Sequence, residues 1–89
     1  MNAFVEKYYQ AKTWFERAQF MLAYHNFMVG QYKARQANWT IRMTAKSMDR
    51  SSGYVSEDLR LAEFIKDHPE ILKAVSRDAA LKQMRNYYA

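Results

Sequence analysis

The chain of 89 residues has no cysteine, one proline and two glycines. Without cysteine it can form neither a disulfide scaffold nor a thiolate zinc site, and it has no cysteine nucleophile. With so little glycine and proline, tight turns must be few, while residues that favour helices are abundant. These features predict a single all-α domain over residues 1–89.

Features of membrane-spanning, secreted and catalytic proteins are also missing. No apolar run approaches the roughly 18 residues that span a bilayer, and no basic start precedes an apolar segment as in a signal peptide. His25 and His68 have no carboxylate at metal-ligand spacing, so His25 is expected to be hydrogen-bonded in the core or at an interface. We therefore expect a cytoplasmic protein with no metal, cofactor, small-molecule substrate or enzymatic activity.

Positive charge is abundant in this chain, and its distribution is uneven. The formal net charge is +5 and the isoelectric point is near 9.6, which favours a phosphate backbone or an anionic membrane as partner. Residues 32–50 carry five basic side chains and one acidic side chain, whereas residues 51–67 have a net charge of −2. The strongest attraction for phosphate is therefore expected over residues 32–50.

Apolar residues recur at alternating spacings of four and three from Phe4 to about Val29, which predicts one long helix within residues 1–31. Further apolar residues widen this stripe in the second half of the helix, and Gly30 is its expected end. Either the rest of the chain covers this wide surface, or the surface forms a dimer or partner interface. The interface candidates are Trp14, Phe20, Met21, Tyr24, Phe27 and Met28.

Capping residues divide the next segment into two helices. Thr40 is expected to cap a helix over Ile41–Met48, because threonine is a favoured residue at this position. After a short turn at residues 49–51, Ser51 or Ser52 is expected to cap a second helix.

The only proline separates these helices from the end of the chain. His68 precedes Pro69 and is expected to end the second helix, because the residue before a proline disfavours helical backbone angles. Pro69 suits the first position of a short helix that reaches about Ala74. Ser76 is expected to cap a last helix, so that two short C-terminal helices occupy residues 69–87.

The pair of helices over residues 40–62 has the packing residues of a helix-turn-helix. This motif needs a small residue where the helices cross and apolar residues on their facing sides, while the start of the second helix stays free for the major groove. Ala45 suits the crossing and Met48 the apolar plug. Val55 and Leu59 face back toward them. The positions free for base contacts are Ser51, Ser52, Gly53, Tyr54, Ser56 and Glu57, with Arg60 one turn on.

Segment Thr44–Lys46, followed by Val55 and Leu59, resembles the helix-turn-helix of phage Cro and repressor proteins. The strings Trp39–Ala45 and Ser52–Leu59 are similar to the motif of ParB-like partition proteins and of related small phage or plasmid proteins. The resemblance covers about 24 of the 89 residues and implies binding to double-stranded DNA. The contact positions that it carries over are Ser51, Ser52, Gly53, Ser56 and Arg60.

The sequence departs from this pattern in the turn and in the second helix. Asp49 stands where glycine is usual, and aspartate tolerates the left-handed backbone conformation. Arg50 replaces an apolar residue, and we expect it to point outward toward phosphate while neighbouring apolar side chains fill the core. Glu57 and Asp58 repel phosphates, although Glu57 can also accept a hydrogen bond from a cytosine amino group.

The sequence therefore predicts a homodimeric protein that binds duplex DNA with some sequence preference. It would act as a phage or plasmid regulator, for example of transcription, or as a partition accessory in the bacterial cytoplasm or nucleoid. Phosphate contacts are expected at Lys33, Arg35, Arg42, Lys46 and Arg50. The alternative is a protein-binding adaptor or inhibitor whose aromatic N-terminal helix docks a larger partner.

Overall fold

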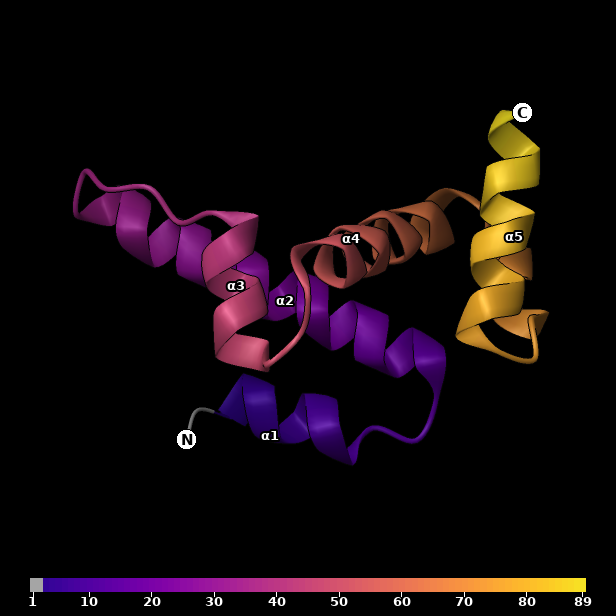
Figure 1. Ribbon diagram of the computed structural model, residues 1–89, viewed down its shortest axis with the longest axis horizontal. Coiled ribbons are helices and arrows are strands. Elements are labelled where there is room, and N and C mark those ends of the chain that lie inside the picture. Colours follow the sequence, from indigo (N-terminus) through magenta and orange to yellow (C-terminus); the bar gives the residue numbers. More distant parts are fainter. Residues whose placement is uncertain (1–2) are drawn as a thin grey trace.

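The computed structural model describes residues 3–89, and this range contains helices and no β-strand. The chain is all-α, as its composition predicts (Figure 1). None of the helices in this range is long and apolar enough to cross a membrane. In chain order the elements are α1 (Ala3–Gln10), α2 (Trp14–Ala34), α3 (Ile41–Met48), α4 (Ser52–Asp67), the 3-10 helix η1 (Pro69–Lys73) and α5 (Arg77–Tyr88).

The prediction of one long N-terminal helix is wrong, because the chain breaks between α1 and α2 at residues 11–13. The Thr13 hydroxyl accepts a hydrogen bond from the backbone N–H of Glu16 at 3.2 Å and so begins a new helix. α1 folds back along α2, which buries Tyr8 in the same cluster as Met21 (Figure 1). The apolar spacing continues unchanged through the break, so the pattern by itself gives no sign of it.

Gly30 does not end α2, contrary to the prediction. The helix continues to Ala34, and the residue with a left-handed backbone after it is Gln36, whose φ is 59°. The backbone N–H of Ala37 donates to the Tyr32 carbonyl at 2.9 Å, which satisfies one of the last carbonyls of the helix. A local hydrogen-bonded turn therefore ends this helix without glycine.

The predicted capping residues of the later helices are confirmed. The hydroxyl of Thr40 accepts a hydrogen bond from the N–H of Met43 at 3.3 Å, and α3 begins at the next residue after Thr40. Ser51 caps α4 by accepting from the N–H of Tyr54 at 3.1 Å, and Ser76 caps α5 in the same way. The short helix that begins at Pro69 is a 3-10 helix and ends one residue earlier than expected.

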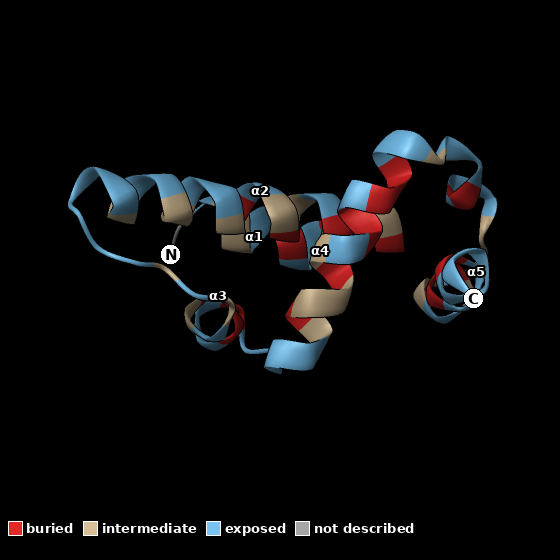
Figure 2. Cartoon of the chain, turned by 90° about the horizontal axis from the view of Figure 1, so that it is seen from above, coloured by how far each residue is buried: buried red, intermediate tan, exposed pale blue. Residues whose placement is uncertain are grey.

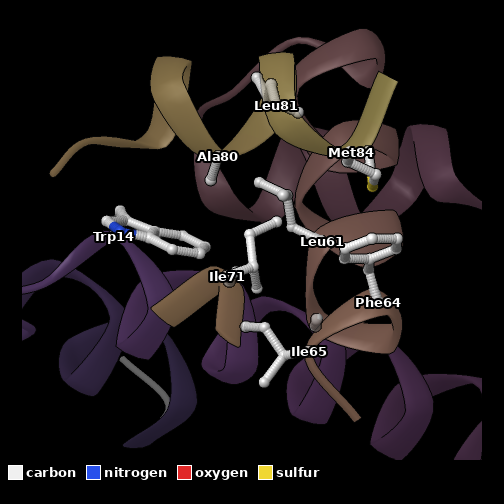
Figure 3. Packing of buried hydrophobic residues seen from close by; sticks show 10 residues of the cluster. Trp14, Leu61, Phe64, Ile65, Ile71, Ala80, Leu81 and Met84 are labelled. Atoms are coloured by element: carbon white, nitrogen blue, oxygen red, sulfur yellow. The ribbon is translucent and has the colours of Figure 1, made fainter. Parts of the chain in front are cut away.

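Two clusters of buried side chains lie along α4 and α2. The first core joins α1, the middle of α2, α3 and the start of α4, and consists of Tyr8, Met21, Tyr24, Ala45, Met48 and Val55. The second core joins the start of α2, the rest of α4, η1 and α5, and Figure 3 shows its packing. It consists of Trp14, Ala18, Leu61, Ala62, Phe64, Ile65, Ile71, Ala80, Leu81 and Met84.

These two cores decide which face of α4 remains accessible. Figure 2 shows buried residues along one side of α4 and exposed residues on its other side and at its beginning. α3 packs on α4 near its first turns, and α5 packs on it farther along the helix. The start of α4 and the outer side of this helix are therefore open to solvent.

Candidate nucleic-acid interface

The connection between α3 and α4 is a short turn that depends on one unusual backbone conformation. Asp49 has φ 55° and ψ 47°, the left-handed conformation expected for an aspartate in place of glycine. The backbone N–H of Arg50 donates to the carbonyl of Ala45 at 2.9 Å. The chain changes direction at this turn, so that α3 runs across the direction of α4 (Figure 1).

The residues predicted to pack the two helices together do so. Three of them are buried in the first core and the fourth, which is partly exposed, packs against that core. In chain order they are Ala45, Met48, Val55 and Leu59. These four residues therefore pack α3 and α4 together, as the sequence predicts.

Directional polar contacts add to the apolar packing between α3 and α2. The buried hydroxyl of Thr44 accepts a hydrogen bond from Trp39 Nε1 at 2.6 Å and lies 2.7 Å from His25 Nδ1. Burial lowers the pKa of His25 below its ordinary value of 6.5, so the imidazole is neutral at pH 7. A neutral ring lets the Thr44 O–H donate to Nδ1, so His25 is hydrogen-bonded as predicted.

The beginning of α4 is open to solvent. Ser51, Ser52 and Gly53 are exposed, and a Cβ atom added to Gly53 would have no neighbour within 4 Å. Arg60 is also exposed, and Ser56 is half-buried. The five contact positions carried over from the resemblance therefore include four exposed residues on α4 or its cap.

Two further residues predicted as base contacts are engaged within the chain. The ring of Tyr54 contacts two guanidinium groups, with Arg77 Cζ at 3.6 Å and Arg50 Cζ at 4.9 Å from its centroid. Glu57 forms ion pairs with Arg77 at 3.2 Å and with Arg85 at 3.0 Å. Neither side chain is free to reach a base without giving up these contacts.

Asp58 and Arg77 form a buried pair that sequence reasoning missed. Arg77 Nε donates to Asp58 Oδ1 at 2.9 Å, and the Asp58 carboxylate is buried. Burial raises the pKa of Asp58, while the hydrogen bond from Arg77 opposes this shift. The other carboxylate oxygen, Oδ2, has no hydrogen-bond partner among residues 3–89. Asp58 follows Val55 by three residues and so falls on the buried stripe of α4, which is a usable signal of burial.

The basic residues predicted to contact phosphate are all exposed. Among residues 3–89, four of them form no ion pair: Lys33, Arg35, Arg42 and Lys46. The fifth, Arg50, is exposed but also contacts other side chains of the protein. Its Nε donates to the hydroxyl of Tyr8 at 3.2 Å, and its guanidinium lies over aromatic rings, because three tyrosines gather beside the turn.

The aromatic surface predicted as an interface is mostly internal. Trp14, Met21 and Tyr24 are buried, and Phe20 and Met28 pack against the first core from partly exposed positions. These five side chains support the reading in which the rest of the chain covers the helix. The remaining candidate, Phe27, is 48% exposed.

A groove with a volume of about 830 Å³ runs along the outer face of α4, between the beginning of α3 and the end of α5. Two predicted base contacts, Ser56 and Arg60, belong to its lining. The other lining residues are Ile41, Leu59, Glu63, Phe64, Asp67, Met84, Arg85, Tyr88 and Ala89. This face of α4 thus combines polar groups with apolar side chains.

Comparisons with known proteins add no relative. No family model, curated protein or solved structure matches the chain. Within residues 3–89, no group of three or more acidic, histidine or cysteine side chains is placed to hold a metal ion. The likeness to Cro-type and ParB-like motifs therefore depends on the motif residues alone and stays a prediction.

Proposed function

We propose that this protein binds duplex DNA, with α3 and α4 as a helix-turn-helix and the first turn of α4 directed into the major groove. The observation that carries the proposal is the exposed start of α4 at Ser51–Gly53, which follows a helix with two exposed cations, Arg42 and Lys46. Small side chains at the start of the helix permit close approach to base edges. The cations supply contacts to phosphate.

The biological role that follows is that of a phage or plasmid regulator or a partition accessory in the bacterial cytoplasm or nucleoid. A homodimer would place two copies of α4 in successive major grooves, one helical turn apart. Selection from a pool of random duplexes, followed by sedimentation of the protein on the selected DNA, tests both points. A dimer on a palindromic site is expected, and a monomer on a site without symmetry would contradict the dimer.

The phosphate contacts are tested by a double variant and a matched control. Arg42→Ala with Lys46→Ala should weaken binding to every duplex and reduce the slope of log Kd against log salt by about 0.9 per lost contact. The control is Lys73→Ala with Lys82→Ala, which removes two exposed cations from η1 and α5. An equal change in slope for both double variants would show a general charge effect and would contradict the assignment of Arg42 and Lys46.

The groove along α4 favours a second candidate, a protein-binding adaptor. Apolar side chains from three helices, including Ile41, Phe64 and Met84, line it beside charged residues, as in sites that accept an amphipathic helix. A mobility-shift assay with random duplexes at two salt concentrations separates the candidates. Failure to bind any duplex even at low salt would contradict the DNA proposal and favour the adaptor.

A further inference from the structure

Two arginines of α5 bind one carboxylate of α4. Arg85 Nη2 lies 3.0 Å from Glu57 Oε2, and Arg77 Nη2 lies 3.2 Å from Glu57 Oε1. Each oxygen of Glu57 therefore has its own cationic partner. Charge-assisted hydrogen bonds of this kind are stronger than neutral ones, so they hold the carboxylate toward α5.

The neighbouring carboxylate is neutralised by the same helix. Asp58 is buried and accepts a hydrogen bond from Arg77 at 2.9 Å, and Arg77 also donates to the backbone carbonyl of Tyr54 at 3.1 Å. Residues 51–67 have a net charge of −2. Because two arginines of α5 pair with Glu57 and Asp58, this region and its partners together are neutral.

The position of the Glu57–Arg85 pair connects it to the proposed DNA-binding face. Ser56 precedes Glu57 in α4, and Ser56, Arg60 and Arg85 line the same groove. The side chain of Glu57 is 34% exposed and that of Arg85 is 65% exposed. A carboxylate at this border without its counter-ion would repel the phosphates of a duplex in contact with Ser56 and Arg60.

We infer that α5 makes α4 compatible with DNA by supplying counter-ions, and that Arg85 acts on Glu57 and does not contact DNA. This inference rests on the proposed function. It assigns Arg85 a positioning and neutralising role, whereas an exposed arginine on a DNA-binding face is ordinarily taken as a phosphate contact. The two roles differ in what happens when Glu57 is removed together with Arg85.

The test measures duplex affinity for the full chain and for Arg85→Gln, Glu57→Gln and the double variant. Removing one partner of an exposed ion pair beside the interface is expected to change the Kd for the duplex about threefold. We expect Arg85→Gln to bind about threefold more weakly, Glu57→Gln to bind about threefold more tightly, and the double variant to match the unaltered protein. We also expect the salt slope of Arg85→Gln to stay unchanged, because no phosphate contact is lost.

Several outcomes would overturn the inference. If the double variant binds as weakly as Arg85→Gln, and the slope falls by about 0.9, Arg85 contacts phosphate directly. If Lys82→Gln, another exposed cation of α5, weakens binding as much as Arg85→Gln, the effect is one of net charge and not of the pair. Circular dichroism confirms that each variant is folded, and Arg77 is left intact for this purpose. If the unaltered protein binds no duplex, the proposed function itself fails. The other outcomes require that the unaltered protein binds a duplex, so the two kinds of failure can be told apart.

Discussion

The two cores that α4 connects are built from different interactions. In the region of the first core, hydrogen bonds join helices directly: His25 and Trp39 meet the hydroxyl of Thr44, and Tyr9 donates to the Met48 carbonyl. The second core is mainly aliphatic, with Leu61 and Ile71 fully buried in it (Figure 3). Its polar contacts include the hydrogen bond from Trp14 to the Ala74 carbonyl and, beside the core, the pair that Arg77 forms with the buried Asp58.

This difference indicates two ways of positioning a helix. Apolar burial stabilises without a strong preference for direction, whereas a buried hydrogen bond requires a particular distance and angle. The orientation of α3, and with it the proposed interface, therefore depends on a few polar atoms. The free energy of folding depends more on the second core, which buries more apolar side chains.

Leu61→Ala is expected to have the largest effect. Leu61 is fully buried in the second core, and its truncation loses apolar burial and leaves a cavity, at a cost of about 3 kcal/mol. Urea unfolding followed by circular dichroism measures this loss. The control is Leu72→Ala, since Leu72 is 37% exposed and should lose much less. Equal losses at the two positions would contradict the importance of the second core.

Thr44→Val is expected to cost about 2 kcal/mol, because it leaves the Trp39 N–H without its acceptor in a buried site while keeping the side-chain shape. Ser47→Ala, an exposed hydroxyl on the same helix, should change stability by less than about 0.5 kcal/mol. In NMR spectra the indole resonance of Trp39 should move, while that of Trp14, which donates to the Ala74 carbonyl, should not. Equal movement of both would contradict a local role for Thr44.

The pH dependence of stability should reveal a smaller contribution from the half-buried His25. Burial lowers its pKa in the folded protein, so the unfolded chain binds more protons between that lowered pKa and 6.5. The free energy of unfolding should therefore fall as the pH decreases from 6.5 through the folded pKa. Unfolding at several pH values, with His25→Gln as control, measures this contribution. A slope that is the same in both proteins would show that His25 is not its source.

Gly30→Ala is expected to have the smallest effect and to stabilise the protein. Gly30 lies inside α2 with an ordinary helical backbone, and a Cβ atom there would have no neighbour within 4 Å. Replacing glycine by alanine in a helix interior should raise the unfolding free energy by about 0.7 kcal/mol. The reciprocal change at an exposed position of the same helix, Ala23→Gly, should lower it by a similar amount. A loss of stability from Gly30→Ala would contradict an open, unstrained helical site at this position.

Local signals allowed α3, the turn that follows it and the start of α4 to be predicted well. The caps at Thr40 and Ser51 and the turn at Asp49 depend on hydrogen bonds with residues nearby in the chain. Their conformations can therefore be predicted from the sequence. The break at Thr13 also carries a local signal, because Thr13 and Glu16 three residues later have the spacing of a capping pair. The apolar spacing that continues through this break favoured one long helix instead. The turn at Gln36 uses a residue with no strong preference for its conformation.

The candidate site was predicted less completely, because the partners of its charged side chains are distant in sequence. Glu57 was expected to reach a base and Arg50 to reach phosphate, yet both are bound by side chains from other helices. The spacing of Asp58 from Val55 indicates burial, but nothing near it in sequence identifies Arg77 as its partner. The predicted exposure of Ser52 and Gly53 agrees with the structure, since both begin a helix.

By itself, the sequence determined the all-α class, the caps of α3, α4 and α5, and the apolar residues that join α3 to α4. Each of these follows from contacts within a few residues or from a regular spacing. Only the tertiary structure decided which charges remain exposed on α4. Long side chains such as Arg77 and Arg85 take their partners from whichever helix packs against their own, and that packing involves the whole chain.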